Sequence, residues 1–384
     1  MRIRGSISLI GVLLSIGTAA GVIFTLAPED RISIKMGVLF TSLGFIFFIS
    51  LSEFLVQVAL TTAIGRYFRE KYGLSLSDAL DIINKLVSAV QAGLSCLTGV
   101  VVCLWSCTRS LLHASHFMSE AYAWFGAAYF FYDIWSMFEV HACEKVEKQS
   151  QKKIKYNNNS KISNVSEKFN VKSISSANKC NGSGDNELNR NVKFEPSIKS
   201  VYALNEDLNR AAAVNNASLK SYILDSPIII MHHLFIGSFG FLVIVYLRGG
   251  LGDCVFGFVY LMELSTPFVS LRGILSKMGL KTSRLYVING LVMLGTFFFC
   301  RVAMFPYVCY MYSQVVGLPY WQAIWSLPTG CKTSIVILML PQVYWFYLML
   351  KGAFKVFFIA GRKKNVIKNF HEQHILVHNK NKSK

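Results

Sequence analysis

Ionisable side chains occur at a few positions inside otherwise apolar stretches of this sequence. The positions are Glu53, Asp133, Glu139, His232, His233, Glu263, Arg272 and Arg301. A charged side chain at the centre of a membrane helix costs about 2.5–3.5 kcal/mol on insertion scales, so each is a functional hypothesis. At 1.5 Å per residue, Asp133 and the two adjacent histidines lie about 8–10 Å inside the same side of a membrane. We expect them, together with Glu263, to form one cluster.

A histidine beside a carboxylate can act as a general base near neutral pH, because the carboxylate holds the imidazole in one tautomer. Such a base can deprotonate an amine or hydroxyl that attacks a thioester, or the histidine can accept the acyl group itself. Adjacent residues point about 100° apart on a helix, so one of His232 and His233 should face Asp133. The equally weighted alternative is a buried pair that only ties helices together. No metal site is predicted, because no further ligands accompany the pair.

The segment Glu263-Leu-Ser-Thr-Pro-Phe is the second concentration of polar groups in an apolar run. It places a carboxylate, two hydroxyls and a proline kink within five residues, and a kink frees backbone carbonyls. This pattern indicates the lining of a cavity. The residues that we expect to bind lipid or substrate are Tyr129, Tyr132, Glu263, Ser265 and Thr266.

The composition places these residues in a membrane protein. The chain has 384 residues, of which 53% are hydrophobic and 16% charged, and its mean hydropathy is +0.42. Soluble domains average about 25% charged residues. These values exclude a disordered chain, an ordinary soluble enzyme and a nucleic-acid partner. The nine cysteines lie mostly in apolar runs without metal-site spacing, which predicts packing residues and no disulfide framework.

Eight apolar runs are long enough, at roughly 17–25 residues, to cross a bilayer as helices. They cover residues 7–27, 36–60, 84–108, 119–140, 227–247, 253–276, 285–313 and 333–360. The first is longer than the apolar core of a usual signal peptide, so we interpret it as a span or signal-anchor. The loops on one side hold 30 Lys and Arg residues and those on the other hold 5. Both termini should therefore be cytosolic.

The predicted membrane domain is interrupted by one long polar segment. Residues 145–225 contain 14 Asn and 14 Lys or Arg with little periodicity, which predicts a disordered cytosolic loop. Glycosylation triplets within it are expected to be chance occurrences in an Asn-rich segment. The resulting organisation is an N-terminal extra helix (1–35), the first part of the membrane domain (36–144), the loop (145–225), the second part (226–360) and a basic cytosolic tail (361–384).

Several motifs resemble the TLC domain, named for TRAM, Lag and CLN proteins. They are Tyr129-Phe-Phe-Tyr-Asp-Ile-Trp-Ser-Met137, the pair His232-His233, and Glu263-Leu-Ser-Thr-Pro-Phe-Val-Ser-Leu271. In the C-terminal third, Cys300-Arg-Val-Ala-Met-Phe-Pro306 and Pro341-Gln-Val-Tyr-Trp-Phe346 look like the third TLC-domain-containing subfamily. That subfamily has been proposed to include a ceramide synthase.

The resemblance implies an all-α polytopic protein whose seven to eight helices form a barrel around a lipid cavity, in the endoplasmic reticulum or Golgi. In ceramide synthases a histidine pair is essential for acyl transfer from acyl-CoA to a sphingoid base. His232 and His233 match that pair, and Asp133 and Glu263 match the neighbouring motifs. The implied catalytic residues are His232, His233 and Asp133.

Three functions remain open from the sequence. The leading one is ceramide synthesis or control of ceramide levels, with acyl-CoA as co-substrate and no bound cofactor. The second is a non-enzymatic lipid sensor, carrier or regulator of membrane composition that uses the same cavity. The third is a cargo or chaperone adaptor that uses the loop or the tail. The expected partners are membrane lipids, acyl-CoA and a sphingoid base, and a homo-oligomer is compatible with all three functions.

Overall fold

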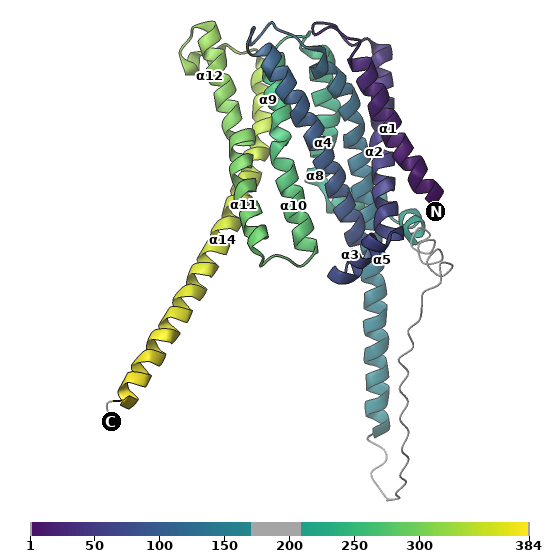
Figure 1. Ribbon diagram of the computed structural model, residues 1–384, viewed down its shortest axis with the longest axis vertical. Coiled ribbons are helices and arrows are strands. Elements are labelled where there is room, and N and C mark those ends of the chain that lie inside the picture. Colours follow the sequence, from purple (N-terminus) through teal and green to yellow (C-terminus); the bar gives the residue numbers. More distant parts are fainter. Residues whose placement is uncertain (1, 170–208, 383–384) are drawn as a thin grey trace, which may run out of the picture. The chain divides into compact units, whose positions relative to one another are not determined.

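The chain is helical throughout the parts that the structure, a computed structural model, describes: residues 2–169 and 209–382 (Figure 1). The helices are α1 (Arg2–Ile23), α2 (Ile34–Thr61), α3 (Ala63–Tyr72), α4 (Leu76–Ser106), α5 (Phe117–Phe169), α7 (Leu219–Asp225), α8 (Pro227–Leu234), η1 (Phe235–Gly240), η2 (Val243–Leu247), α9 (Asp253–Leu261), η3 (Met262–Ser265), α10 (Thr266–Lys277), α11 (Arg284–Phe297), η4 (Phe298–Ala303), α12 (Met304–Val316), α13 (Tyr320–Ser326) and α14 (Thr329–Lys382). These ranges contain no strand, which confirms the all-α class. η1, η2 and η4 are π-helical, a form found frequently at functional sites.

Seven described helical segments are long and apolar enough to cross a membrane. They are Gly5–Ile23, Ile34–Thr61, Leu76–Ser106, Pro227–Leu247, Asp253–Lys277, Arg284–Val316 and Thr329–Lys355. Each corresponds to a predicted run, and their number agrees with the expectation of seven to eight spans. The missing run, 119–140, lies in α5, which carries Glu120 and Asp133. Both side chains are buried in protein, so α5 does not need an apolar surface at these positions.

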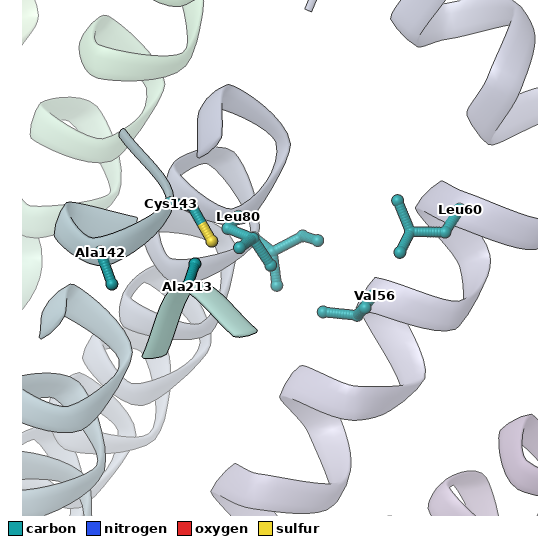
Figure 2. Close-up of a cluster of buried hydrophobic side chains, with 7 residues drawn as sticks. Val56, Leu60, Leu80, Ala142, Cys143 and Ala213 are labelled. Carbon is teal, nitrogen blue, oxygen red and sulfur yellow. The ribbon is translucent and has the colours of Figure 1, made fainter. Parts of the chain in front are cut away.

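One compact unit contains residues up to 16, residues 45–84 and the described part of 130–237. Its core joins α2, α4 and α5 to the segment before α7 (Figure 2). The buried side chains are Val56, Leu60, Leu80, Ile83, Ala142, Cys143 and Ala213. Small residues on α5 let the neighbouring helices approach closely, as is usual where helices pack within a membrane.

The two ends of segment 145–225 are ordered helix and not the disordered loop that its composition predicts. α5 continues to Phe169, and residues 209–215 form a further helix. Arg210 in that helix contacts Oε1 of Glu53 at 3.0 Å and Oε2 of Glu139 at 2.7 Å. This double ion pair fastens the segment to α2 and α5, a contact that composition alone does not reveal. The middle of the loop, 170–208, lies outside the described residues.

The second compact unit contains residues 17–44, 85–129 and the described part of 238–384. Its core brings Met262 of η3 against Met304 and Phe305 of α12, with apolar residues of α14 packed around them. At one end, the connection before α5 is tied to two others. Phe117 donates its backbone N–H to Pro28 O at 2.9 Å, and Gly252 donates its N–H to Leu112 O at 2.8 Å.

A disulfide joins Cys107 and Cys254 at this same end of the second unit. The expectation that the cysteines serve only as packing residues is therefore wrong for this pair. The two residues are separated by 147 positions and no spacing motif marks them, so the pairing depends entirely on how α4 and α9 lie together. The remaining cysteines of the described residues are free thiols.

Candidate functional site

Asp133 and His233 lie against each other inside the first unit. His233 Nδ1 is 3.0 Å from Asp133 Oδ2, which makes an ion pair when the imidazole is protonated. Asp133 is 3% exposed. Its second oxygen, Oδ1, is buried and has no hydrogen-bond partner among the described residues. A buried carboxylate oxygen without a donor is costly, so it marks a place where a ligand N–H or O–H would be stabilised.

Close packing between α5 and the α8–η1 segment fixes the position of this pair. α8 begins with Pro227 at its first turn, where the missing N–H costs no hydrogen bond. The ring of Phe130, three residues before Asp133, meets the His233 ring edge-to-face at 6.0 Å. Gly237 allows the close approach of η1 to α5, because a Cβ there would lie 2.8 Å from Phe130 Cβ. The imidazole therefore lies between α5 and its own helix.

Only one member of the histidine pair is placed against the carboxylate, as the helical spacing predicts. The rings of His232 and His233 lie 5.8 Å apart and are tilted by 56°, so they point in different directions. Nδ1 of His233 lies 3.0 Å from Asp133 Oδ2 without hydrogen-bond geometry, and Nε2 on the opposite edge of the ring is the nitrogen that can exchange a proton with a ligand. This arrangement can orient a general base.

Tyr132 and Tyr129 are both buried next to this region of α5. Tyr132 stacks with Phe48 at a centroid distance of 6.2 Å. Tyr129 donates its hydroxyl to Ser88 Oγ at 2.9 Å. We predicted both tyrosines as lipid-binding residues, and the contacts show them packed between helices.

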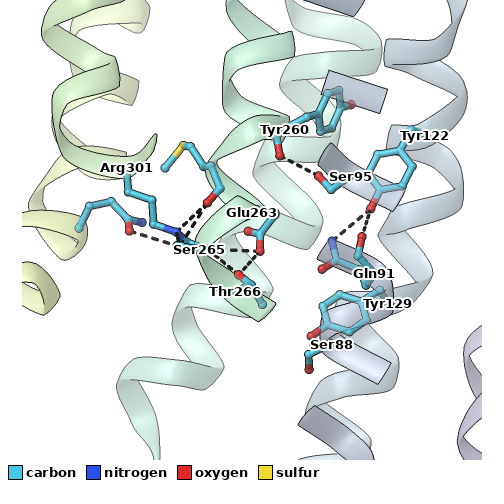
Figure 3. Close-up of polar contacts among 12 residues, drawn as sticks. Ser88, Gln91, Ser95, Tyr122, Tyr129, Tyr260, Glu263, Ser265, Thr266 and Arg301 are labelled. Carbon is cyan, nitrogen blue, oxygen red and sulfur yellow. Dashed lines mark hydrogen bonds and ion pairs between the residues drawn. The ribbon is translucent and has the colours of Figure 1, made fainter. Parts of the chain in front are cut away.

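The segment around Glu263 forms a separate polar cluster in the second unit, centred on Arg301 (Figure 3). Arg301 Nη2 lies 3.2 Å from Glu263 Oε2 and 2.8 Å from Thr266 Oγ1. Its Nε donates to Ser265 Oγ at 2.8 Å. Thr266 also donates to Glu263 at 2.5 Å. The cluster is thus internally paired, and three of the predicted lipid-binding residues are partners of one arginine.

We did not predict Arg301 as the partner of Glu263, because the two residues lie 38 positions apart on different helices. Arg301 lies in the π-helical η4 and Glu263 in the 3₁₀ η3, and these two segments pack together in the second unit. The sequence feature that could have indicated this pairing is charge, because a buried arginine in a membrane helix requires a counter-ion.

A polar stripe on α4 forms a further set of hydrogen bonds between helices (Figure 3). Besides Ser88, it contains Gln91, whose Nε2 donates to the Tyr122 hydroxyl at 3.2 Å. One turn further, Ser95 donates to the backbone carbonyl of Tyr260 at 3.1 Å. These residues recur every three to four positions and lie on one helix face. They join α4 to α5 and α9, which is a structural role for buried polar groups in membrane helices.

Comparison with known proteins identifies the class of this helical domain. A family model described as the TLC domain matches residues 81–351. The chain belongs to the TLC domain family. The match includes Asp133, both adjacent histidines and the Glu263 segment, which together carried the resemblance in the sequence.

The relatives refine the subfamily. The chain is 32% identical to human TLC domain-containing protein 4 over 157 residues, which cover 38% of this chain and 60% of the relative. It is 31% identical to TLC domain-containing protein 4-A of Xenopus laevis over 140 residues, covering 35% and 52%. These matches are to the fourth group and not specifically to the third, which corrects the finer expectation. The chain spans about half to three-fifths of the length of these relatives. No solved structure shows a significant match.

Membership gives a broad class of function. A TLC domain is a membrane domain with a lipid-related function, and the seven apolar helices are those of an integral membrane protein. The names of the relatives specify no substrate.

Proposed function

We propose that this TLC domain protein transfers a fatty acyl group from acyl-CoA to the amine of a sphingoid base, and so makes ceramide or sets its level. The observation that supports this proposal is the Asp133–His233 pair, with one carboxylate oxygen 3.0 Å from the imidazole and the other buried without a donor. The pair offers a base for an amine and, beside it, an acceptor for a substrate hydroxyl or ammonium group.

The reaction follows from these positions. His233 Nε2 removes a proton from the sphingoid amine while the amine nitrogen attacks the thioester carbonyl carbon. The new C–N bond forms, the C–S bond breaks, and the leaving thiolate takes the proton back from the imidazolium. The products are an amide and free CoA. Asp133 stabilises the imidazolium, while its Oδ1 accepts a hydrogen bond from a sphingoid hydroxyl. His232, on the neighbouring face of the helix, contacts substrate without taking the proton.

The cellular setting proposed with this activity is the membrane of the endoplasmic reticulum or Golgi, with both termini in the cytosol. Acyl-CoA would then reach the site from the cytosolic side, and membrane lipids would be the protein's surroundings and partners. No bound cofactor is part of this proposal.

A non-enzymatic lipid sensor or carrier is the second candidate, and the Arg301 cluster favours it. Glu263, Ser265 and Thr266 are engaged by Arg301, as expected of residues that hold helices together. In this alternative the Asp133–His233 pair recognises a lipid headgroup without a chemical step.

A turnover assay tests the proposal. Purified protein in nanodiscs receives acyl-CoA and a sphingoid base, and ceramide is quantified by mass spectrometry. We expect turnover by the wild type and a loss of roughly 10²–10⁴-fold in His233→Ala, the usual contribution of a general base. His113→Ala, at an exposed histidine, is the matched control and should retain activity. Wild-type protein that binds sphingoid lipid but makes no ceramide with any chain length would favour the sensor.

A further inference from the structure

The turn between α10 and α11 carries positive charge without nearby acidic residues in the sequence. Arg272, Lys277, Lys281 and Arg284 lie within thirteen positions, and no Asp or Glu occurs from residue 264 to residue 371. α10 and α11 pack side by side on either side of this turn (Figure 1). α10 and α11 themselves therefore contain no acidic residue to balance this charge.

Of these four cations, Arg272 lies furthest from the turn within its helix. It lies five residues before the end of α10, about 8 Å from that end at 1.5 Å per residue. Its guanidinium carbon lies 4.2 Å from the centroid of the Tyr286 ring on α11. Among the residues that the structure describes, it makes this ring contact but no hydrogen bond or ion pair. Arg301, which also lies within a membrane-spanning segment of this unit, is by contrast surrounded by hydrogen-bond acceptors.

Glycines make room for this cation and for a second one. A Cβ at Gly290 of α11 would lie 2.2 Å from Arg272 Nη1, so the guanidinium lies directly on the α11 backbone. A Cβ at Gly273 of α10 would lie 2.4 Å from Lys85 Cε. Lys85 of α4 thus lies against α10 at the position next to Arg272. One glycine of α11 thus accommodates Arg272, and one glycine of α10 accommodates Lys85.

We propose that Arg272 and its surroundings form a binding site for a phosphate group. A guanidinium presents a rigid fork of N–H donors that matches phosphate oxygens, and an aromatic ring can hold its plane without using those donors. Further positive charge comes from Lys277, the last residue of α10, and from Lys85 of α4, which lies against Gly273. The phosphate can come from a phospholipid headgroup or from the nucleotide part of CoA. This site does not depend on the acyl-transfer chemistry proposed above.

Two binding measurements separate the sources. The full-length protein in phosphatidylcholine nanodiscs is titrated with desulfo-CoA, which carries all the phosphates but cannot be an acyl donor. In a second arm, phosphatidic acid is added to the lipid and its retention on the protein is measured by native mass spectrometry. Arg272→Gln should weaken binding of at least one probe by about ten- to a hundredfold, the value of charge-assisted hydrogen bonds. Arg272→Lys should give an intermediate loss.

Lys332→Ala is the matched control, because Lys332 also lies over an aromatic ring, 5.8 Å from the centroid of Trp325. It should leave both affinities unchanged. If Arg272→Gln does not fold, Tyr286→Leu provides the test, since it keeps the charge and removes the ring that orients it. A loss confined to desulfo-CoA assigns the site to CoA, and a loss confined to phosphatidic acid assigns it to a lipid headgroup.

Folded Arg272→Gln that binds both probes like the wild type would overturn the site, as would an equal loss in Lys332→Ala. If the wild-type protein binds phosphate but makes no ceramide, the result argues only against the proposed acyl transfer and leaves the phosphate site supported. The two proposals can therefore be refuted independently.

Discussion

The two oxygens of Asp133 have different surroundings, and this difference defines what the residue can do. Oδ2 faces His233, whereas Oδ1 is buried and has no hydrogen-bond partner among the described residues. Asparagine has the same shape but no charge, so it separates an electrostatic role from a packing role.

Asp133→Asn should reduce turnover by roughly 10²–10⁴-fold, because the neutral amide cannot stabilise the imidazolium or fix its tautomer. The measurement is kcat for ceramide formation alongside the unfolding temperature. A purely structural pair gives the opposite pattern, in which the unfolding temperature falls and lipid binding declines in proportion.

His116 is a buried histidine outside the predicted spans, and its titration should affect stability. Burial lowers the pKa of His116 below its usual 6.5, partly opposed by Asp253 and reinforced by Arg109. Its ring Nδ1 accepts a hydrogen bond from the Met118 backbone N–H at 3.2 Å. The neutral form is therefore favoured in the fold.

The unfolding temperature should consequently fall as pH drops below about 6.5, because the unfolded chain then binds a proton that the folded one does not. His116→Asn keeps an acceptor near the Nδ1 position and removes the titration. Thermal unfolding between pH 7.5 and 5.5 should show a smaller decline in this variant. An equal decline in both proteins would refute the assignment to His116.

At the scale of elements, the disulfide between Cys107 and Cys254 joins the end of α4 to the start of α9. A cross-link over so long a loop restricts the unfolded chain strongly. Cys107→Ser should therefore lower stability by about 2–5 kcal/mol, measured as a fall in unfolding temperature. Mass-tagging of thiols should show two cysteines that react only after reduction. Cys331→Ser, at an exposed free thiol, is the control and should leave the unfolding temperature unchanged.

The elements were predictable from sequence where one physical constraint dominates. Bilayer thickness sets the length of a span, so seven apolar helices were found at the expected places. Asp133 and His233 could be paired because both lie at similar depth in regular helices. Glu263 and Arg301 were not paired, because no spacing signal relates two residues that lie 38 positions apart on different helices. The ordered end of the long loop depends on Arg210, whose two carboxylate partners lie far away in sequence.

At the scale of the whole molecule, the disulfide constrains how many times the chain crosses the membrane. Cys107 and Cys254 must be on one side, so an even number of crossings separates them. The segment Pro227–Leu247 supplies one crossing, and α5 is the described helix before it that is long enough to supply the other. We therefore expect α5 to cross the membrane, with its polar residues covered by protein.

This topology predicts the location of the glycosylation triplets. Disulfides persist in oxidising compartments, so the Cys107 end should face the lumen and segment 145–225 the cytosol, in agreement with the Lys and Arg distribution. The triplet at Asn216 should remain unmodified, and endoglycosidase should not change the mass of the protein made in microsomes. A mass shift abolished by Asn216→Gln would reverse the orientation.

The central claim is that the reacting groups bind between Asp133 and His233. The most direct measurement is an electron cryo-microscopy structure of the protein with a sphingoid base and a non-reactive thioether analogue of acyl-CoA. The account predicts density for the amine within about 3.5 Å of His233 Nε2, a hydrogen-bonding distance, and a substrate hydroxyl at Asp133 Oδ1. Lipid bound elsewhere, with the Asp133–His233 pair enclosed by protein side chains alone, would contradict the account.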